Sequence, residues 1–148
     1  MAESLVRRHR IWETFLVEKL HYTLSEVHKD AEVLEHSDSL ELIDRLEEFL
    51  GKPERCPHGG IIPKKDGDYT EDSYTILDDL QEGKPAVVDR FIDNHDLLEY
   101  LADVKLKIGD KIEVLEKLPF EGPLKIKLLD SGQEVLISYK AAHYIFVK

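Results

Sequence analysis

The feature that most limits how this chain can fold is a run of histidines and glutamates at helical spacing in residues 28–36. On a helix, side chains at i, i+4, i+7 and i+8 form one stripe, and these positions hold His28, Glu32, Glu35 and His36. Val27, Ala31 and Leu34 lie beside the stripe and can face a core. The run therefore predicts a packed helix with potential metal ligands along one edge, although a solvated charged face is the commoner meaning of such a pattern.

A second pair of histidine and carboxylate, upstream of this run, favours the metal interpretation. His9 and Glu13 lie at i and i+4 within a helical pattern that covers residues 3–20. Two helices that each offer an imidazole and a carboxylate can surround one cation. The candidate core positions of the first helix are Leu5, Trp12, Phe15, Leu16 and Leu20.

A third amphipathic helix is expected after possible cap residues at positions 37–39, with Gly51 as its C-terminal cap. Its apolar side would consist of Leu40, Leu42, Ile43, Leu46, Phe49 and Leu50. Three short amphipathic helices need another surface to cover their apolar sides.

Residues 52–74 are rich in Pro, Gly, Lys and Asp, which predicts a loop and linker. Its notable element is Cys56-Pro57-His58-Gly59-Gly60. A cysteine and a histidine separated by one residue can both point at one ion, and the glycines permit a tight backbone path. The alternative is a surface thiol beside a proline turn.

The second half of the chain predicts a small antiparallel barrel, because apolar residues alternate from Leu106 onward between Gly-containing turns. Residues 75–80 and 86–91 are expected to be short extended segments, and residues 97–102 a helix. Asp93 and Asp96 flank the start of this helix, where an aspartate is usually a cap. The expected fold class is α+β, with a helical domain over residues 1–74 and a β-domain over residues 75–148.

The composition argues against direct binding of nucleic acid. The formal net charge is −11, from 31 acidic and 20 basic residues, whereas DNA affinity depends on neutralising phosphates with Lys and Arg. One cysteine excludes an intrachain disulfide and fits a reducing, cytoplasmic compartment. No apolar run of about 18 residues is present, so neither a membrane span nor a signal peptide is expected.

Several segments resemble the diphtheria-toxin-repressor family of metal-dependent transcriptional regulators. RRHRIWETFLVEKL and SEVHKDAEVLEH are similar to its metal-binding and dimerisation domain, and CPHGGIIP and LKIGDKIEVLEKLPFEGPLKIKL to its loop and its SH3-like, FeoA-type domain. The resemblance implies a homodimer. The family's winged helix-turn-helix has no counterpart here, so operator DNA is expected to be bound only through that missing domain.

The resemblance also implies two metal sites. A primary, DNA-activating site would use His9, Glu32, Glu35 and His36, and a second site between the domains would use Glu13, Cys56, His58 and Asp93, with Asp96 as the alternative to Asp93. His28 matches a ligand of the second site in iron-type members. Glu32 stands where iron-type members carry cysteine and manganese-type members glutamate, which favours Mn²⁺ over Fe²⁺, while Zn²⁺ could bind in vitro.

The expected function is therefore metal sensing and dimerisation in a Mn²⁺- or Fe²⁺-dependent repressor that controls metal homeostasis. A carboxylate-bridged di-iron enzyme is the first alternative, but such enzymes need Glu-x-x-His on each of two helices, and we expect no enzyme. A FeoA-like adaptor for metal transport is the second alternative, and it leaves the ligand-bearing helices unexplained.

Overall fold

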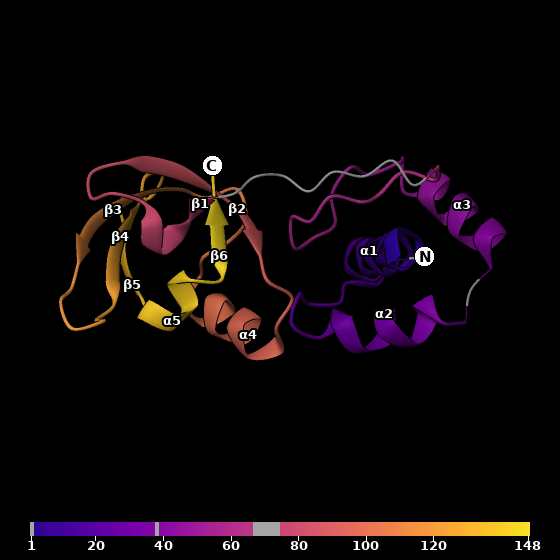
Figure 1. Cartoon of the computed structure of the whole chain (residues 1–148), viewed down its shortest axis with the longest axis horizontal. Helices are drawn as coiled ribbons and strands as arrows, with labels where there is room; N and C mark the ends of the chain where they lie inside the picture. The colour runs from indigo at the N-terminus through magenta and orange to yellow at the C-terminus, as the bar shows by residue number, and fades with distance from the viewer. Residues whose placement is uncertain (1, 38, 67–74) are drawn as a thin grey trace. The chain divides into compact units, whose positions relative to one another are not determined.

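The computed structural model describes residues 2–37, 39–66 and 75–148, and it divides into two compact units, Met1–Asp72 and Ser73–Lys148 (Figure 1). The domain boundary predicted between residues 74 and 75 falls at the edge of a stretch outside the described residues. Each unit has its own secondary structure, helical in the first and mainly β in the second. The predicted α+β class is confirmed.

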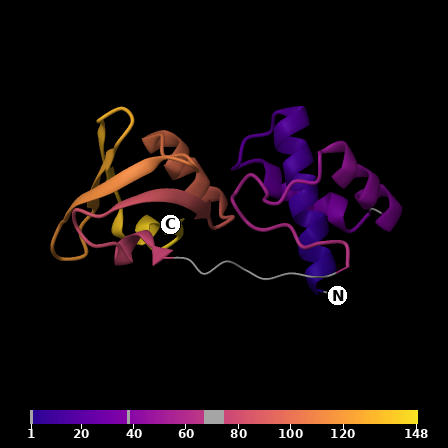
Figure 2. The same cartoon turned by 90° about the horizontal axis from the view of Figure 1, so that it is seen from above.

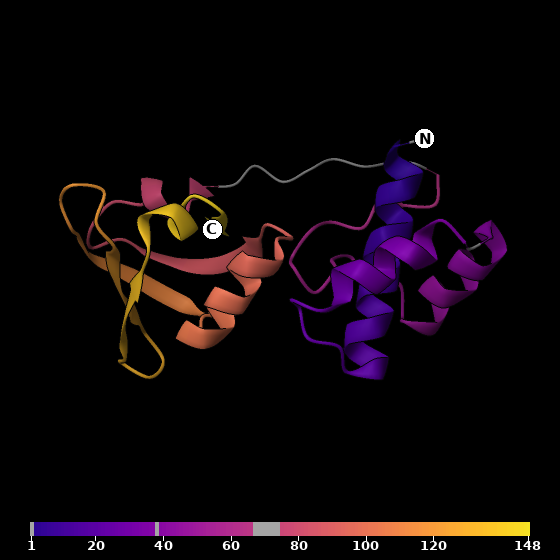
Figure 3. The same cartoon turned by 90° about the horizontal axis from the view of Figure 1, so that it is seen from below.

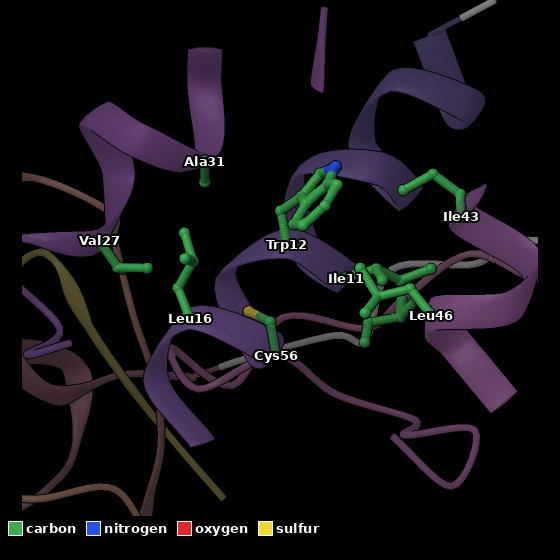
Figure 4. Packing of buried hydrophobic residues seen from close by; sticks show 9 residues of the cluster. Ile11, Trp12, Leu16, Val27, Ala31, Ile43, Leu46 and Cys56 are labelled. Carbon is green, nitrogen blue, oxygen red and sulfur yellow. The ribbon is translucent and has the colours of Figure 1, made fainter. Parts of the chain in front are cut away.

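The first unit contains three helices, α1 (Ala2–Leu20), α2 (Val27–Glu35) and α3 (Leu40–Phe49). The segment that follows α3 returns along α1 (Figure 2). Apolar side chains from all three helices and from this segment form one buried cluster (Figure 4): Ile11, Trp12, Leu16, Val27, Ala31, Ile43, Leu46, Cys56 and Ile62. Helical periodicity thus predicted Trp12, Leu16, Val27 and Ala31 in this cluster, but it missed the fully buried Ile11.

The ends of α3 follow from local backbone chemistry. The hydroxyl of Ser39 accepts a hydrogen bond from the N–H of Leu42 at 3.1 Å, which satisfies one of the free donors at the helix start. Beyond the C-terminal end, Gly51 adopts φ +81°, a left-handed conformation that costs glycine little. Both predicted ends of the third helix are confirmed.

Several apolar residues predicted for the core are instead exposed. Leu5 and Leu20 lie near the ends of the 19-residue α1, and Leu20 is 54% exposed. Because α2 and α3 have only 9 and 10 residues, they cover the middle turns of α1 and leave its ends open. On α3, Ile43 and Leu46 are buried, whereas Leu40, Leu42 and Phe49 are exposed.

The second unit is a six-stranded antiparallel sheet with the order β1-β6-β2-β3-β4-β5. Its strands are β1 (Thr75–Ile76), β2 (Pro85–Phe91), β3 (Lys111–Lys117), β4 (Leu124–Leu128), β5 (Glu134–Ile137) and β6 (Ile145–Val147). Register shifts at Val88/Arg90 and Val114/Glu116 bend the sheet. The sheet is roughly barrel-like, as the predicted SH3-like, FeoA-type domain requires. It is not closed, since no pairing of β1 with β5 occurs in the described residues.

Helix α4 (His95–Val104) and the short α5 (Tyr139–Ala142) accompany the sheet (Figure 3). Asn94 caps α4 by accepting from the N–H of Leu97, so neither Asp93 nor Asp96 is the cap residue. The prediction of an extended segment over residues 75–80 is wrong beyond Ile76. Leu77–Asp79 instead forms a 3₁₀ turn that buries Leu77. Within the described ranges, no helix has the length and apolar character needed to cross a membrane.

Candidate metal centre

Helix α1 places His9 and Glu13 one turn apart on the same face. Nε2 of His9 lies 3.1 Å from Oε2 of Glu13, and Nδ1 of the same ring lies 2.5 Å from Oε2 of Glu35 on α2. Glu13 is only 2% exposed, and Glu35 is also buried. The imidazole of His9 therefore connects a buried carboxylate on α1 with one on α2.

The loop that carries Cys56 and His58 is tightly folded. The N–H of Cys56 donates to the carbonyl of Gly60 at 2.8 Å, and the N–H of Gly59 donates to the carbonyl of Cys56 at 2.9 Å. Gly59 has φ +92°, which a residue with a Cβ rarely adopts. This turn buries both side chains and brings one potential ligand atom each from Glu13, Cys56 and His58 within 4.8 Å of one another.

The ring of His58 is oriented by contacts on both sides. Nε2 lies 3.2 Å from the carbonyl oxygen of Leu24, and Nδ1 lies 3.3 Å from Oε2 of Glu13. A carbonyl only accepts, so Nε2 carries a proton and donates it to Leu24. Nδ1 is consequently the nitrogen that faces the carboxylate, and a second-shell carbonyl of this kind is typical of metal-binding histidines.

The surroundings of His58 favour its charged form in the metal-free protein. Burial alone lowers the pKa of His58, but the contacts with Cys56 and Glu13 outweigh burial and raise the pKa to about 11. A positive charge is therefore stable at the position that Nδ1 occupies beside Glu13. A divalent metal ion bound to Nδ1 of His58 would take the place of the proton on this nitrogen.

The surroundings of the buried Glu13 carboxylate show whether Glu13, Cys56 and His58 fit a metal ion. Oε2 of Glu13 is buried, and two imidazole nitrogens approach it, Nε2 of His9 at 3.1 Å and Nδ1 of His58 at 3.3 Å. A buried carboxylate costs free energy unless a cation compensates it, and the charged His58 has this role in the metal-free chain, where a metal ion could replace its proton. Carboxylate, imidazole and thiol donors together suit a divalent transition metal. The residues present therefore fit a metal ion.

His28 lies beside this cluster. One ligand atom each of His9, Glu13 and His28 fall within 4.8 Å of one another, and the rings of His9 and His28 have centroids 4.8 Å apart. His28 also approaches Glu32 at 3.5 Å. The first unit therefore holds two overlapping groups of potential ligands that share Glu13.

Residues 1–64 match the family described as "Iron dependent repressor, metal binding and dimerisation domain", and residues 75–148 match the FeoA domain. A solved structure described as a manganese-dependent transcriptional repressor in complex with manganese superimposes with a TM-score of 0.92 at 36% identity, covering 99% of this chain and 69% of that one. The chain belongs to the iron-dependent repressor family.

This chain matches different fractions of the length of other relatives. The iron-dependent repressor IdeR of Mycobacterium leprae is 28% identical over 161 residues, which cover all of this chain and 69% of IdeR. A probable metal transport system membrane protein of Chlamydia trachomatis is 44% identical over 64 residues, which are 43% of this chain and 14% of that protein.

The structure divides the helical stripe that was predicted to carry the primary repressor site. Glu35 is buried against His9, whereas Glu32 and His36 are exposed, with the side chain of His36 at 63%. Nε2 of His36 lies 3.5 Å from Oε1 of Glu35. Val27 and Ala31 face the core as predicted, and the core side of α2 extends to Glu35.

The structure connects residues that were predicted to belong to separate sites. His9 was assigned to one site and Glu13 to the other, yet they contact each other. Asp93 lies in the second unit between β2 and α4, and Asp96 lies in the first turn of α4. The carbonyl of Leu24 was missed, because a backbone acceptor leaves no signal in the sequence.

Proposed function

We propose that the chain is the metal-sensing and dimerising part of a Mn²⁺- or Fe²⁺-dependent transcriptional repressor that controls metal homeostasis. The observation that carries this proposal is the buried Oε2 of Glu13, which imidazole nitrogens of His9 and His58 approach at 3.1 and 3.3 Å, with the thiol of Cys56 beside it. Membership of the iron-dependent repressor family supports the regulatory role. Regulators of this kind bind a metal and perform no chemistry on it, so no enzymatic activity is proposed.

The proposed sites use the residues named from the sequence. Glu13, Cys56 and His58 would hold one ion, with Asp93 as a further ligand on the strength of the resemblance alone. The other set, His9, Glu32, Glu35 and His36, would hold a second ion with more water in its shell, because Glu32 and His36 are exposed. Each bound ion would supply a positive charge that attracts carboxylates from different parts of the chain.

Control of DNA binding would follow from that shared charge. A metal that contacts several elements stabilises the arrangement in which its ligands converge, and it shifts the population toward that arrangement. His9 contributes by linking Glu13 on α1 to Glu35 on α2. Operator DNA is proposed to be bound through the family's helix-turn-helix domain, which residues 1–148 do not include.

The donor set bears on which metal is used. Carboxylates and imidazoles suit Mn²⁺ and Fe²⁺, whereas a thiolate favours softer ions. Glu32 in place of a cysteine leaves Cys56 as the one thiol in the chain. We therefore propose Mn²⁺ first and Fe²⁺ second as the regulatory ion, and expect Zn²⁺ to compete in vitro at the site that includes Cys56.

A cytoplasmic homodimer is the proposed assembly. Leu42 and Phe49 lie on the same side of α3 and are exposed in a single copy of the chain, and residues 1–64 match a dimerisation domain. Exposed apolar patches on a helix indicate an interaction surface. A twofold contact would cover this surface on both copies at once.

The proposed function is tested by calorimetric titration of Mn²⁺ into the wild type, C56A/H58A and E35A/H36A. The buried set is better preorganised, so we expect C56A/H58A to remove the tighter binding step and E35A/H36A to affect mainly a weaker one. Far-UV circular dichroism of each metal-free variant establishes that it is folded. The opposite ranking would contradict the assignment of the two sites, and Mn²⁺ binding unchanged in both variants would refute the metal-sensing function.

A further inference from the structure

The loop with Cys56 and His58 is closed by its own backbone. Arg55 and Ile61 form an antiparallel bridge, and the N–H of Ile62 donates to the carbonyl of Glu54 at 2.8 Å. Inside this bridge, the N–H of Cys56 donates to Gly60 at 2.8 Å. The loop therefore behaves as a small hairpin, and whatever holds residues 60–61 also places the thiol and the imidazole.

Arg10 of α1 holds the hairpin at this point. Its Nη1 donates a hydrogen bond to the carbonyl oxygen of Ile61. Its guanidinium also packs directly on Gly60, since a Cβ built on Gly60 would lie 3.0 Å from both Cζ and Nε of Arg10 and 3.3 Å from Nη2. The absence of a side chain at position 60 is what allows the guanidinium to lie so close to the loop backbone.

The same helix presents the carboxylate that completes the ligand group. Glu13 follows Arg10 by three residues, a rise of about 4.5 Å along α1. The hydroxyl of Thr14 donates to the carbonyl of Arg10 at 2.7 Å, within this turn. The distance from the clamped hairpin to Glu13 is therefore determined by one rigid helical turn.

We propose that Arg10 is a positioning residue for the Glu13–Cys56–His58 site, and that Gly60 provides the space its guanidinium needs. This inference rests on the proposed metal-binding function. It assigns a role to one of three arginines, Arg7, Arg8 and Arg10, that lie close together near the start of α1. Arg10 acts through the loop and is not a ligand, because a guanidinium has no lone pair to offer a metal.

Electrostatics and positioning predict opposite signs for a substitution of Arg10. A guanidinium near a cation site repels the cation, so removal of its charge strengthens metal binding if charge is what matters. If Arg10 positions the loop, its removal instead weakens binding, because the thiol and the imidazole no longer converge on Glu13. The direction of the change therefore decides between the two roles.

The experiment is a Co²⁺ titration of the full chain, monitored by the thiolate-to-Co²⁺ charge-transfer absorption that reports Cys56 as a ligand. We expect R10M to weaken Co²⁺ binding at this site by about 10- to 100-fold, the range typical of lost second-shell partners, and to reduce the charge-transfer band. G60A should act in the same direction, because its Cβ displaces the guanidinium. Gly60 is not among the glycines with positive φ, so alanine fits its backbone.

Arg45 supplies the matched control. Its side chain is 78% exposed and pairs with Glu41 on the same helix, so R45M removes an equal charge at the surface and should leave Co²⁺ affinity and the absorption band unchanged.

The outcomes separate this inference from the proposed function. Unchanged or tighter Co²⁺ binding in R10M, or a lower melting temperature of the metal-free chain with a normal Co²⁺ spectrum, would overturn the role of Arg10. If C56A/H58A also binds Co²⁺ normally, the site itself is wrong. If only C56A/H58A loses the band, the site stands and the positioning role fails. Should R10M not fold, the G60A result decides.

Discussion

Metal binding at the Glu13–Cys56–His58 site is expected to expel a proton from His58. Burial alone lowers the pKa of this histidine, yet the contacts with Cys56 and Glu13 raise it from 6.5 to about 11. The metal-free chain therefore carries an imidazolium at pH 7. A metal can bond to Nδ1 only after the proton has left.

The size of the effect follows from this single proton. Between about pH 6.5 and 8.5 the folded pKa lies above the solution pH, so one proton leaves His58 for each metal bound, and the His58 contribution makes affinity rise about tenfold per pH unit. The contribution of His58 to folding stability changes with pH in the opposite direction, since it falls as the pH rises. A raised folded pKa contributes stability that is fully present below pH 6.5 and is lost as the pH rises through about 11.

Calorimetry in buffers of different ionisation enthalpy counts the released protons directly. We expect H58Q to release about one proton fewer than the wild type on binding Zn²⁺. H143Q is the matched control, because Nδ1 of His143 bonds to the carbonyl of Tyr139 in the second unit. Equal proton release from H58Q and the wild type would refute the reasoning.

Three further outcomes are expected. I11A should lower the free energy of unfolding by about 2–5 kcal/mol in urea denaturation, because Ile11 is fully buried, and a loss below about 1 kcal/mol would argue against this core. Lys65 and then Arg7 hold the pKa of Asp44 below its usual value, so this carboxylate stabilises the fold above the unfolded pKa near 3.8 and ceases to do so as the pH falls through the folded value. D44N should accordingly lower the urea midpoint at neutral pH, and this loss should shrink as the pH falls below 3.8, whereas an equal loss at every pH would exclude the ion pairs as the cause. F49E should weaken self-association in sedimentation velocity, because Phe49 is 64% exposed on the apolar side of α3, and an undiminished dimer would place the interface elsewhere.

Periodicity predicted the elements that are long enough to show it. The pattern in α1 identified Trp12 and Leu16 as core residues, but it could not show that α1 extends beyond its neighbours and leaves Leu5 and Leu20 exposed. The four-residue α5 was not predicted, since four residues contain little more than one helical turn. Residues 77–79 turn away from the strand direction because Leu77 is buried, a tertiary effect that local propensity does not contain.

The candidate site was predictable in its residue types and less so in its connections. The i, i+4 spacing of His9 and Glu13 correctly indicated a shared face. Cys56 and His58, more than 40 residues later, were linked to Glu13 by family resemblance, because spacing alone carries no information across a loop. The burial of Glu35 depends on how α2 rotates against α1, which the charge pattern does not reveal.

Helix α1 carries, within seven residues, the ion pair of Arg7 with Asp44 and Glu47, the contacts of His9, the clamp of Arg10 and the carboxylate of Glu13. The partners of these side chains lie on α3, on α2 and on the loop of residues 56–61, so α1 contacts each of the other segments of the unit. Inserting one residue there would turn everything beyond it by about 100°. Side chains along α1 can be exchanged one at a time, whereas its length between Arg7 and Glu13 cannot change without separating all of these contacts together.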